Sequence, residues 1–294
     1  MNTAKQRVGP ATQAVLDDGI DPLTPQSPRA SLLATLAQLH PSRLRRTPPL
    51  PLEVRAPLEY VGLLRDPVWG SADGLDLGGR PVALVPGFLA GDASLGPLTD
   101  WLRRADCRTS SAGIRFNVSC STVLIDRIER RIELLAERTG RRVVVVGQSR
   151  GGVLARGVAV RRPDLVEAIV TLGSPHIDPL AIHPLVLLQV VAIGALGSAG
   201  VPGFFGSTCF NGECCERFRE EALGPFPNDV RFVSAYSKTD GVVDWRSCVA
   251  EGAENVEIGG THFGMALNPA AYRTLARVLN DLEAPEPQQQ AAAA

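Results

Sequence analysis

One serine lies between two glycines at a point where the chain is expected to turn sharply. The segment GQSRG at residues 147–151 directly follows the apolar run VVVV, which is typical of a buried strand, and opens the helix-like segment GGVLARGVAVRR. Glycine on both sides permits a turn too tight for larger side chains, and a helix N-terminus favours developing negative charge on the serine oxygen. A serine that only caps a helix would explain Ser149 but not both glycines. The pattern therefore predicts that Ser149 is a nucleophile.

A nucleophilic serine needs a base, and the base needs an acid that orients it. Of the four histidines, only His262 follows the last expected strand, in GGTHFGM, and we interpret it as the base. His176 follows an earlier strand and is expected at the rim of the pocket. The acid is expected just beyond the strand VRFVSAY, where Asp240 and Asp244 both lie. Asp240 precedes a glycine, so a simple turn residue is the alternative interpretation there.

The elements that would position these residues alternate along the chain. Short, nearly all apolar runs are typical of strands buried on both faces of a parallel sheet, and they occur at residues 81–85, 142–147, 167–173 and 230–236. A further run, NVEIG at residues 255–259, is expected to supply another strand. Between them, apolar residues recur at helical spacing over about residues 95–104, 122–138, 151–161 and 270–282. Strands that alternate with helices of this length predict an α/β fold, with a mostly parallel sheet flanked by helices.

Five motifs, in this order, resemble the α/β-hydrolase superfamily and, within it, the lipase and esterase branch: LVPGFLAG, GQSRGG, TLGSPH, SKTDGVV and GTHFGM. The resemblance runs from about residue 81 to about residue 279, and it implies the α/β-hydrolase fold with a catalytic triad in the chain order Ser149, Asp240, His262. It favours Asp240 over Asp244, because the family pattern is an aspartate followed shortly by valine.

The chemistry of such a triad also needs N–H donors for the oxyanion of the tetrahedral intermediate. We expect the backbone N–H of Arg150, at the start of the helix, to be one donor of this oxyanion hole. The resemblance implies Phe88 as the other, since it follows the glycine of a Pro-Gly pair in PGFLAG. Pro86 stands where the family more often has histidine, and ordinary core packing is the alternative for Phe88.

The chain is interpreted as one α/β-hydrolase domain, residues 31–283, between two tails. Residues 1–30 and 284–294 lack apolar periodicity, which predicts disordered ends. Residues 31–70 carry apolar residues at helical spacing and predict a helical arm. Residues 176–228 interrupt the alternation between two strands, and an apolar run, PLVLLQVVAIGAL, lies within them. A structureless loop of this length is improbable, so we expect a helical cap insertion.

Composition narrows the classes of partner. A net charge of -1 offers no broad attraction to nucleic acid, and the longest apolar run is shorter than the roughly 20 residues that span a bilayer. The first residues show no export signal, so we expect a cytoplasmic protein with reduced thiols. The six cysteines match no common zinc spacing, and no metal site is expected. A disulfide stays open as an alternative, among Cys209, Cys214, Cys215 and Cys248.

These features together predict a serine hydrolase that cleaves a small carboxylic ester with an apolar acyl part, through an acyl-enzyme and without a cofactor. Two alternatives remain. The same triad would serve an acyl-thioesterase or an acyltransferase, and the fold would also serve as a non-catalytic binding scaffold. The number of chains that assemble is not indicated by the sequence.

Overall fold

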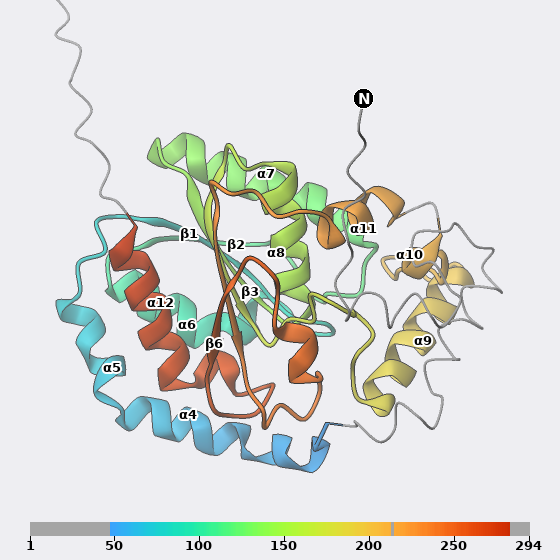
Figure 1. The fold of residues 1–294 in the computed structure, drawn as a ribbon, viewed down its shortest axis with the longest axis horizontal. Helices are drawn as coiled ribbons and strands as arrows, with labels where there is room; N and C mark the ends of the chain where they lie inside the picture. The colour runs from blue at the N-terminus through green and yellow to red at the C-terminus, as the bar shows by residue number, and fades with distance from the viewer. Residues whose placement is uncertain (1–47, 213–214, 283–294) are drawn as a thin grey trace, which may run out of the picture.

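A six-stranded parallel sheet forms the centre of the molecule (Figure 1). The computed structural model describes residues 48–212 and 215–282, so both tails and residues 31–47 of the arm lie outside the described residues. The strands lie in the order β2-β1-β3-β4-β5-β6. Their bounds are β1 Pro81–Val85, β2 Arg108–Ser111, β3 Val143–Gln148, β4 Val166–Leu172, β5 Arg231–Tyr236 and β6 Glu254–Glu257. The predicted α/β fold with a parallel sheet is confirmed.

Five of the six strands coincide with the predicted apolar runs, and the exception is β2. Its sequence, RTSS, is short and polar, and its residues are partly or largely exposed at the edge of the sheet. An edge strand pairs on one side only, so it needs no continuous apolar run, and the sequence therefore gives no signal for it.

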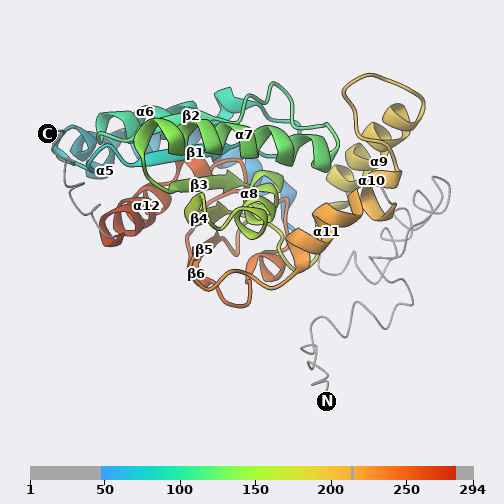
Figure 2. The same cartoon turned by 90° about the horizontal axis from the view of Figure 1, so that it is seen from above.

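The four inner strands, β1, β3, β4 and β5, are largely apolar on both faces because a hydrophobic core lies on each side of the sheet. Alternate residues of β3 separate the two cores, since Val144 and Val146 face one while Val143 and Val145 face the other. The first core is covered by α6 (Gly96–Arg104), α12 (Pro269–Asp281) and the arm. The second is covered by α7 (Ser121–Thr139), α8 (Arg150–Arg161) and α11 (Glu216–Leu223). Figure 2 shows α12 and α8 on opposite sides of the strands.

The arm consists of short helices that run along one end of the sheet (Figure 1). They are η1 (Leu50–Arg55), α4 (Ala56–Arg65), α5 (Pro67–Gly70) and η2 (Ser71–Gly74). Leu63, Val68 and Ala72 are buried in the first core, and Trp101 of α6 donates its ring N–H to the backbone oxygen of Val68. The arm is thereby fixed to the main domain.

The described residues between β4 and β5 include the α-helices α9 (Pro184–Ser198), α10 (Thr208–Asn211) and α11. Helix α11 is part of the main core, because Phe218 and Ala222 pack against α7 and α8 and Glu221 binds Arg161 at 2.9 Å. Only the first part of the expected insertion, with α9 and α10, therefore projects from the sheet (Figure 2). Of the helices described, α9 included, none has the length and apolar character to cross a membrane.

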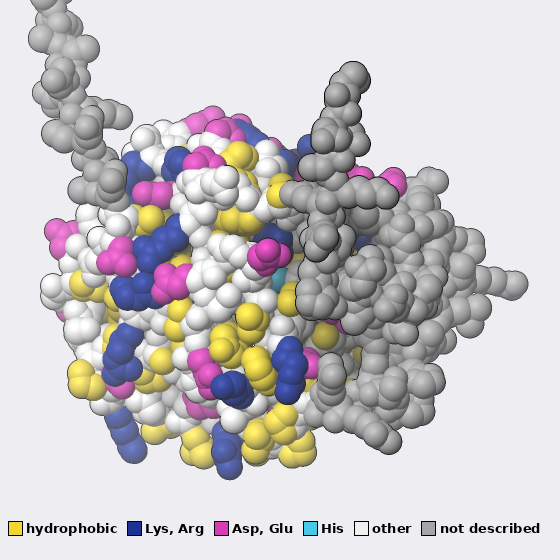
Figure 3. Space-filling model, in the orientation of Figure 1, with side chains coloured by type: hydrophobic (Ala, Val, Ile, Leu, Met, Phe, Trp, Pro, Cys, Tyr) yellow, Lys and Arg dark blue, Asp and Glu magenta, His cyan; other side chains and the backbone are white. Residues whose placement is uncertain are grey.

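Acidic and basic side chains are interspersed over the face shown in Figure 3. This mixture matches the net charge of -1. Several of these groups form ion pairs across elements, such as Arg231 with Asp281 and Arg273 with Asp66.

Candidate active site

The residues predicted to do chemistry meet at the carboxyl end of the sheet. The chain passes from β1 outward to β2, and then returns to β3 on the other side of β1. Ligands of open parallel sheets bind at such a point, where the strand order reverses and the loops separate. Phe88 follows β1 and Ser149 follows β3, while Asp240 and His262 follow β5 and β6. Arg150, the fifth predicted site residue, directly follows Ser149. All five therefore lie at one edge of the sheet.

Ser149 occupies a strained turn. Its φ of 53° is unusual for a residue with a side chain, and such conformations persist only where neighbouring structure imposes them. Its N–H donates to the backbone oxygen of Leu172 in β4 at 2.8 Å, which fixes the turn to the next strand. The side chain is partly exposed.

Steric crowding explains the two glycines that flank Ser149. A Cβ atom on Gly151 would lie 2.2 Å from the backbone oxygen of Val85 in β1, and one on Gly147 would lie 2.5 Å from the Cα of Gly152. Neither position can take a larger residue without moving the backbone. The close approach of β3, α8 and β1 therefore requires glycine at both positions of the GxSxG pattern.

Asp240 and His262 form a buried pair. The Nδ1 atom of His262 lies 2.7 Å from Oδ2 of Asp240, and the other carboxylate oxygen accepts hydrogen bonds from the N–H groups of Val242 and Val243. Burial alone would lower the pKa of His262, but the charge and hydrogen bond of Asp240, with the charge of Glu53, raise it above its usual value. Asp244 instead accepts from the N–H of Arg246 at the start of η5 (Trp245–Cys248).

A hydrogen bond ties the turn at Ser149 to the loop that carries His262. The side-chain amide of Gln148, the residue before Ser149, donates to the backbone oxygen of His262 at 3.0 Å. Within residues 48–212 and 215–282, no hydrogen bond is formed by the Ser149 hydroxyl with Nε2 of His262. Such contacts are often long in the absence of substrate and shorten when it binds.

Glu53, in the arm, is the main residue that the sequence did not single out. Its buried carboxylate accepts three backbone hydrogen bonds: from Gly241 at 2.7 Å, from His262 at 2.8 Å and from Phe263 at 2.9 Å. It therefore joins the loop of Asp240 to the loop of His262. No motif or spacing marks this residue, because its partners are 188 to 210 positions away in the chain.

Glu59, one helical segment further along the arm, supports the same loop. It accepts hydrogen bonds from the N–H of Thr261 at 2.8 Å and from its hydroxyl at 3.1 Å. The two carboxylates of the arm thus bind three consecutive residues, 261 to 263, centred on His262.

The loop after β1 passes directly beside Ser149. A Cβ atom on Gly87 would lie 3.2 Å from the Cβ of Ser149. Neither the backbone N–H of Phe88 nor that of Arg150 is used in a hydrogen bond with another described residue. The ring of Phe88 packs against Phe205, with centroids 6.2 Å apart, so its side chain is in an aromatic contact.

Asn117, a second residue that the sequence analysis missed, connects this loop to the turn at Ser149. Its side-chain amide donates to the backbone oxygen of Pro86 at 2.7 Å, and its main chain bonds Leu89 and Ala90. The guanidinium of Arg150 in turn donates to the side-chain oxygen of Asn117 at 2.7 Å. One side chain therefore links the loop after β1 to the side chain of Arg150.

The expectation that His176 shapes the rim of the pocket is wrong. Its ring is buried with an edge against Phe232, and its Nε2 lies 3.0 Å from the hydroxyl of Thr171. Burial lowers the pKa of His176 to about 3, so the ring is neutral and structural.

Comparisons with known proteins agree with this architecture. A family model described as a PGAP1-like alpha/beta domain matches residues 121–192, from α7 to α9. The structure resembles the mature form of a lipase from Bacillus licheniformis, with a TM-score of 0.53 and 15% identity over 70% of this chain and 94% of that one. It also resembles a soluble variant of monoglyceride lipase from Saccharomyces cerevisiae, with a TM-score of 0.51 and 12% identity over 72% and 90%. No curated protein matches the sequence. The chain has the α/β-hydrolase fold.

Replacing Glu53 by glutamine should loosen both loops, because an amide nitrogen cannot accept a backbone N–H. We expect the free energy of unfolding to fall by about 1–3 kcal/mol, the usual cost of disrupting a buried charged hydrogen bond. The amides of Gly241, His262 and Phe263 should exchange with solvent faster, as measured by hydrogen exchange. Glu137→Gln, at an exposed position of α7, is the control. Unchanged exchange at all three amides would contradict this role.

Replacing Asp240 by asparagine should lower the pKa of His262 below its usual value, because burial then outweighs the remaining charge of Glu53. NMR titration of the ring measures this shift, and Asp244→Asn should leave it unchanged. A pKa raised by folding stabilises the protein below pH about 6.5, and this contribution is lost as the pH rises through the folded value. The variant should therefore lose more stability in acid than in base. A larger shift in the Asp244 variant would reverse the assignment.

Proposed function

We propose that this protein is a serine hydrolase that cleaves carboxylic esters through an acyl-enzyme. The observation that carries the proposal is the buried Asp240–His262 pair at the same sheet edge as Ser149, which lies in a strained turn between two obligatory glycines. In this interpretation the turn is a nucleophile elbow and the three residues are a catalytic triad.

The reaction begins when Nε2 of His262 takes the proton of Ser149 as its oxygen attacks the ester carbonyl. The hydrogen bond from Nδ1 to Asp240 selects the tautomer that leaves Nε2 unprotonated, and the carboxylate then stabilises the imidazolium. The raised pKa of His262 supports this role, since it reflects the same stabilisation. His262 next protonates the departing alcohol, and it later activates the water that releases the acid.

The oxyanion formed in each step would be bound by the backbone N–H groups of Phe88 and Arg150. Support comes from their lack of partners among the described residues and from the close approach of the loop at Gly87 to Ser149. Arg150 also begins α8, whose N-terminal dipole favours negative charge at this point. Donors fixed before substrate arrives need no reorganisation during the reaction, and Asn117 supplies that fixation.

The position and side chains of helix α9 indicate that the acyl part of the substrate is apolar. The residue before it, His183, donates its N–H to the oxygen of Val242 in the loop of Asp240, while Phe205, which follows the helix, contacts Phe88. The helix is thus anchored near both halves of the site. Its apolar side chains on one side are buried, whereas three leucines are about half exposed: Leu185, Leu188 and Leu196. We therefore infer that α9 belongs to an apolar cap, as in a lipase or esterase.

A fluorophosphonate probe, which reacts with activated serines, should label the protein at Ser149. Ser149→Ala should abolish the labelling and lower kcat for p-nitrophenyl esters by on the order of 10⁶, the loss seen when a triad serine is removed. Its melting temperature and circular dichroism should match the unaltered chain. Labelling that survives in this variant would exclude Ser149 as the nucleophile, and a failure of the unaltered chain to react would favour the binding scaffold. An acyl-thioester assayed beside the esters separates the thioesterase alternative.

Activity should rise with acyl chain length, because each methylene buried against the cap contributes about 0.8 kcal/mol, a factor of about four in kcat/KM. Leu188→Glu should reduce this gain for long esters while leaving acetate esters nearly unaffected. Leu188 is 52% exposed, so the variant should fold normally. Leu134→Glu is a matched control, since Leu134 is 54% exposed on α7. Equal losses on short and long esters would contradict the role of the cap.

A further inference from the structure

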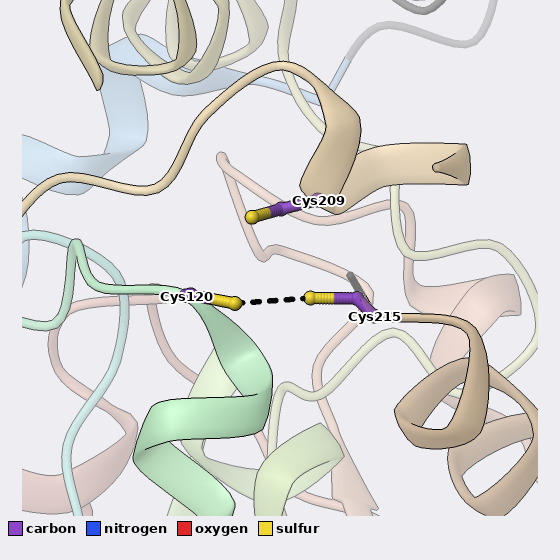
Figure 4. A group of neighbouring side chains, drawn as sticks. All are labelled: Cys120, Cys209 and Cys215. Atoms are coloured by element: carbon purple, nitrogen blue, oxygen red, sulfur yellow. Dashed lines mark hydrogen bonds between the residues drawn. The ribbon is translucent and has the colours of Figure 1, made fainter. Parts of the chain in front are cut away.

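Three cysteines from distant parts of the sequence come together where the projecting segment meets the main domain. Cys120 immediately precedes α7, Cys209 lies in α10, and Cys215 immediately precedes α11. Their Sγ atoms all lie within 4.8 Å of one another. Figure 4 shows the three side chains pointing toward a common centre from three different segments.

The sequence could not reveal this group. Zinc sites are recognised from sequence by closely spaced pairs of ligands, and strands β3 and β4 separate Cys120 from the other two cysteines along the chain. Cys248, which the sequence left open as a disulfide partner, is buried with Val242 and Val243 in a separate small cluster. Cys214 lies outside the described residues.

The geometry of the sulfurs fits ligands of one ion better than a disulfide. Cys120 and Cys215 are 3.3 Å apart between Sγ atoms, well beyond the S–S bond length of about 2.05 Å. Two thiolates on a tetrahedral zinc ion, each at about 2.3 Å, lie about 3.8 Å from each other. A disulfide would also use only two of the three side chains, whereas one metal ion uses all of them.

The surroundings would compensate the charge of such a centre. Zinc with three thiolates carries one net negative charge, and the N-terminus of the 19-residue helix α7 begins next to Cys120. Arg150 donates to the oxygen of Ser119 and to the hydroxyl of Ser121, the residues on either side of Cys120. All four of its side-chain hydrogen bonds to described residues go to neutral oxygens, so its positive charge is available to balance the centre.

The segment between α9 and α11 is short of regular structure. Helix α10 has four residues, too few to be stable alone, and Phe205 is the buried apolar side chain among the described residues between α9 and α10. A metal ion that joins α10 and the start of α11 to the start of α7 would add to the stability of this segment.

We propose that Cys120, Cys209 and Cys215 bind a zinc ion through three thiolates. The ion anchors the projecting segment to the residues that also position Arg150 and Asn117. The described residues supply three of the four ligands of a tetrahedral zinc ion. The role of the ion is structural, because its ligands come from three segments that it joins and none belongs to the Ser149 turn.

The test is the metal content of the full chain, purified with reductant and dialysed against zinc-containing and then metal-free buffer. Elemental analysis and native mass spectrometry should find one zinc ion per chain. Cys120→Ser, Cys209→Ser and Cys215→Ser should each lose it, while Cys107→Ala, at a buried cysteine in the first core, should keep it. Cobalt substituted for zinc should show the intense absorption of tetrahedral thiolate coordination.

Chelation should lower the Tm of the unaltered chain and of Cys107→Ala, but not that of Cys120→Ser. A reduced chain that retains no zinc would overturn the proposal, and so would zinc retained in all three serine variants. A disulfide between two of these cysteines, found by mass spectrometry in a chain without metal, would replace the metal site by a covalent link. These measurements do not depend on ester hydrolysis, so they are independent of the proposed function.

Discussion

The structure depends most on the close crossing of β1, β3 and α8 at Ser149. There the backbone of three elements approaches so closely that only glycine fits at positions 147 and 151, and Ser149 is forced to a positive φ. Such a conformation costs on the order of 1–3 kcal/mol, which the surrounding packing and the hydrogen bond to Leu172 must offset. In return, the serine side chain projects from the sheet edge in a single direction, and every other group of the site is arranged around it.

Two sets of hydrogen bonds stabilise the loops on either side of this turn, and each involves polar groups from distant parts of the chain. On one side, Asn117 and the Arg150 side chain fix the loop after β1. On the other side, Glu53 and Glu59 bind the loops of Asp240 and His262. The site thus receives its geometry from the β2–α7 connection and from the arm as well as from the strands that carry the reacting groups.

Much of the fold was predictable because strands buried on both faces must be apolar and the turn at Ser149 must contain glycines. The strand runs and the fold class follow from these local requirements, whereas the meeting of Ser149, Asp240 and His262 at one edge was predicted from their positions after strands and from the family resemblance. Strand β2 was not predictable, since an edge strand such as RTSS has no apolar signature. Glu53 and Asn117 were missed for a different reason: among the described residues Glu53 binds only backbone groups and Asn117 binds the backbone of Pro86 and the side chain of Arg150, and no sequence motif marks such long-range contacts. His176 was misplaced because its position after a strand did not reveal that Phe232 buries it.

The bonds of Glu53 also bear on the order in which contacts form during folding. Its three partners lie 188, 209 and 210 residues later in the chain, so these contacts are among the most non-local of the described residues. Contacts of such long separation are expected to form late, because the entropy of closing the intervening chain must first be offset. The loop of His262 should therefore join the arm after the central strands have paired. The candidate site is complete only when segments from opposite ends of the domain come together.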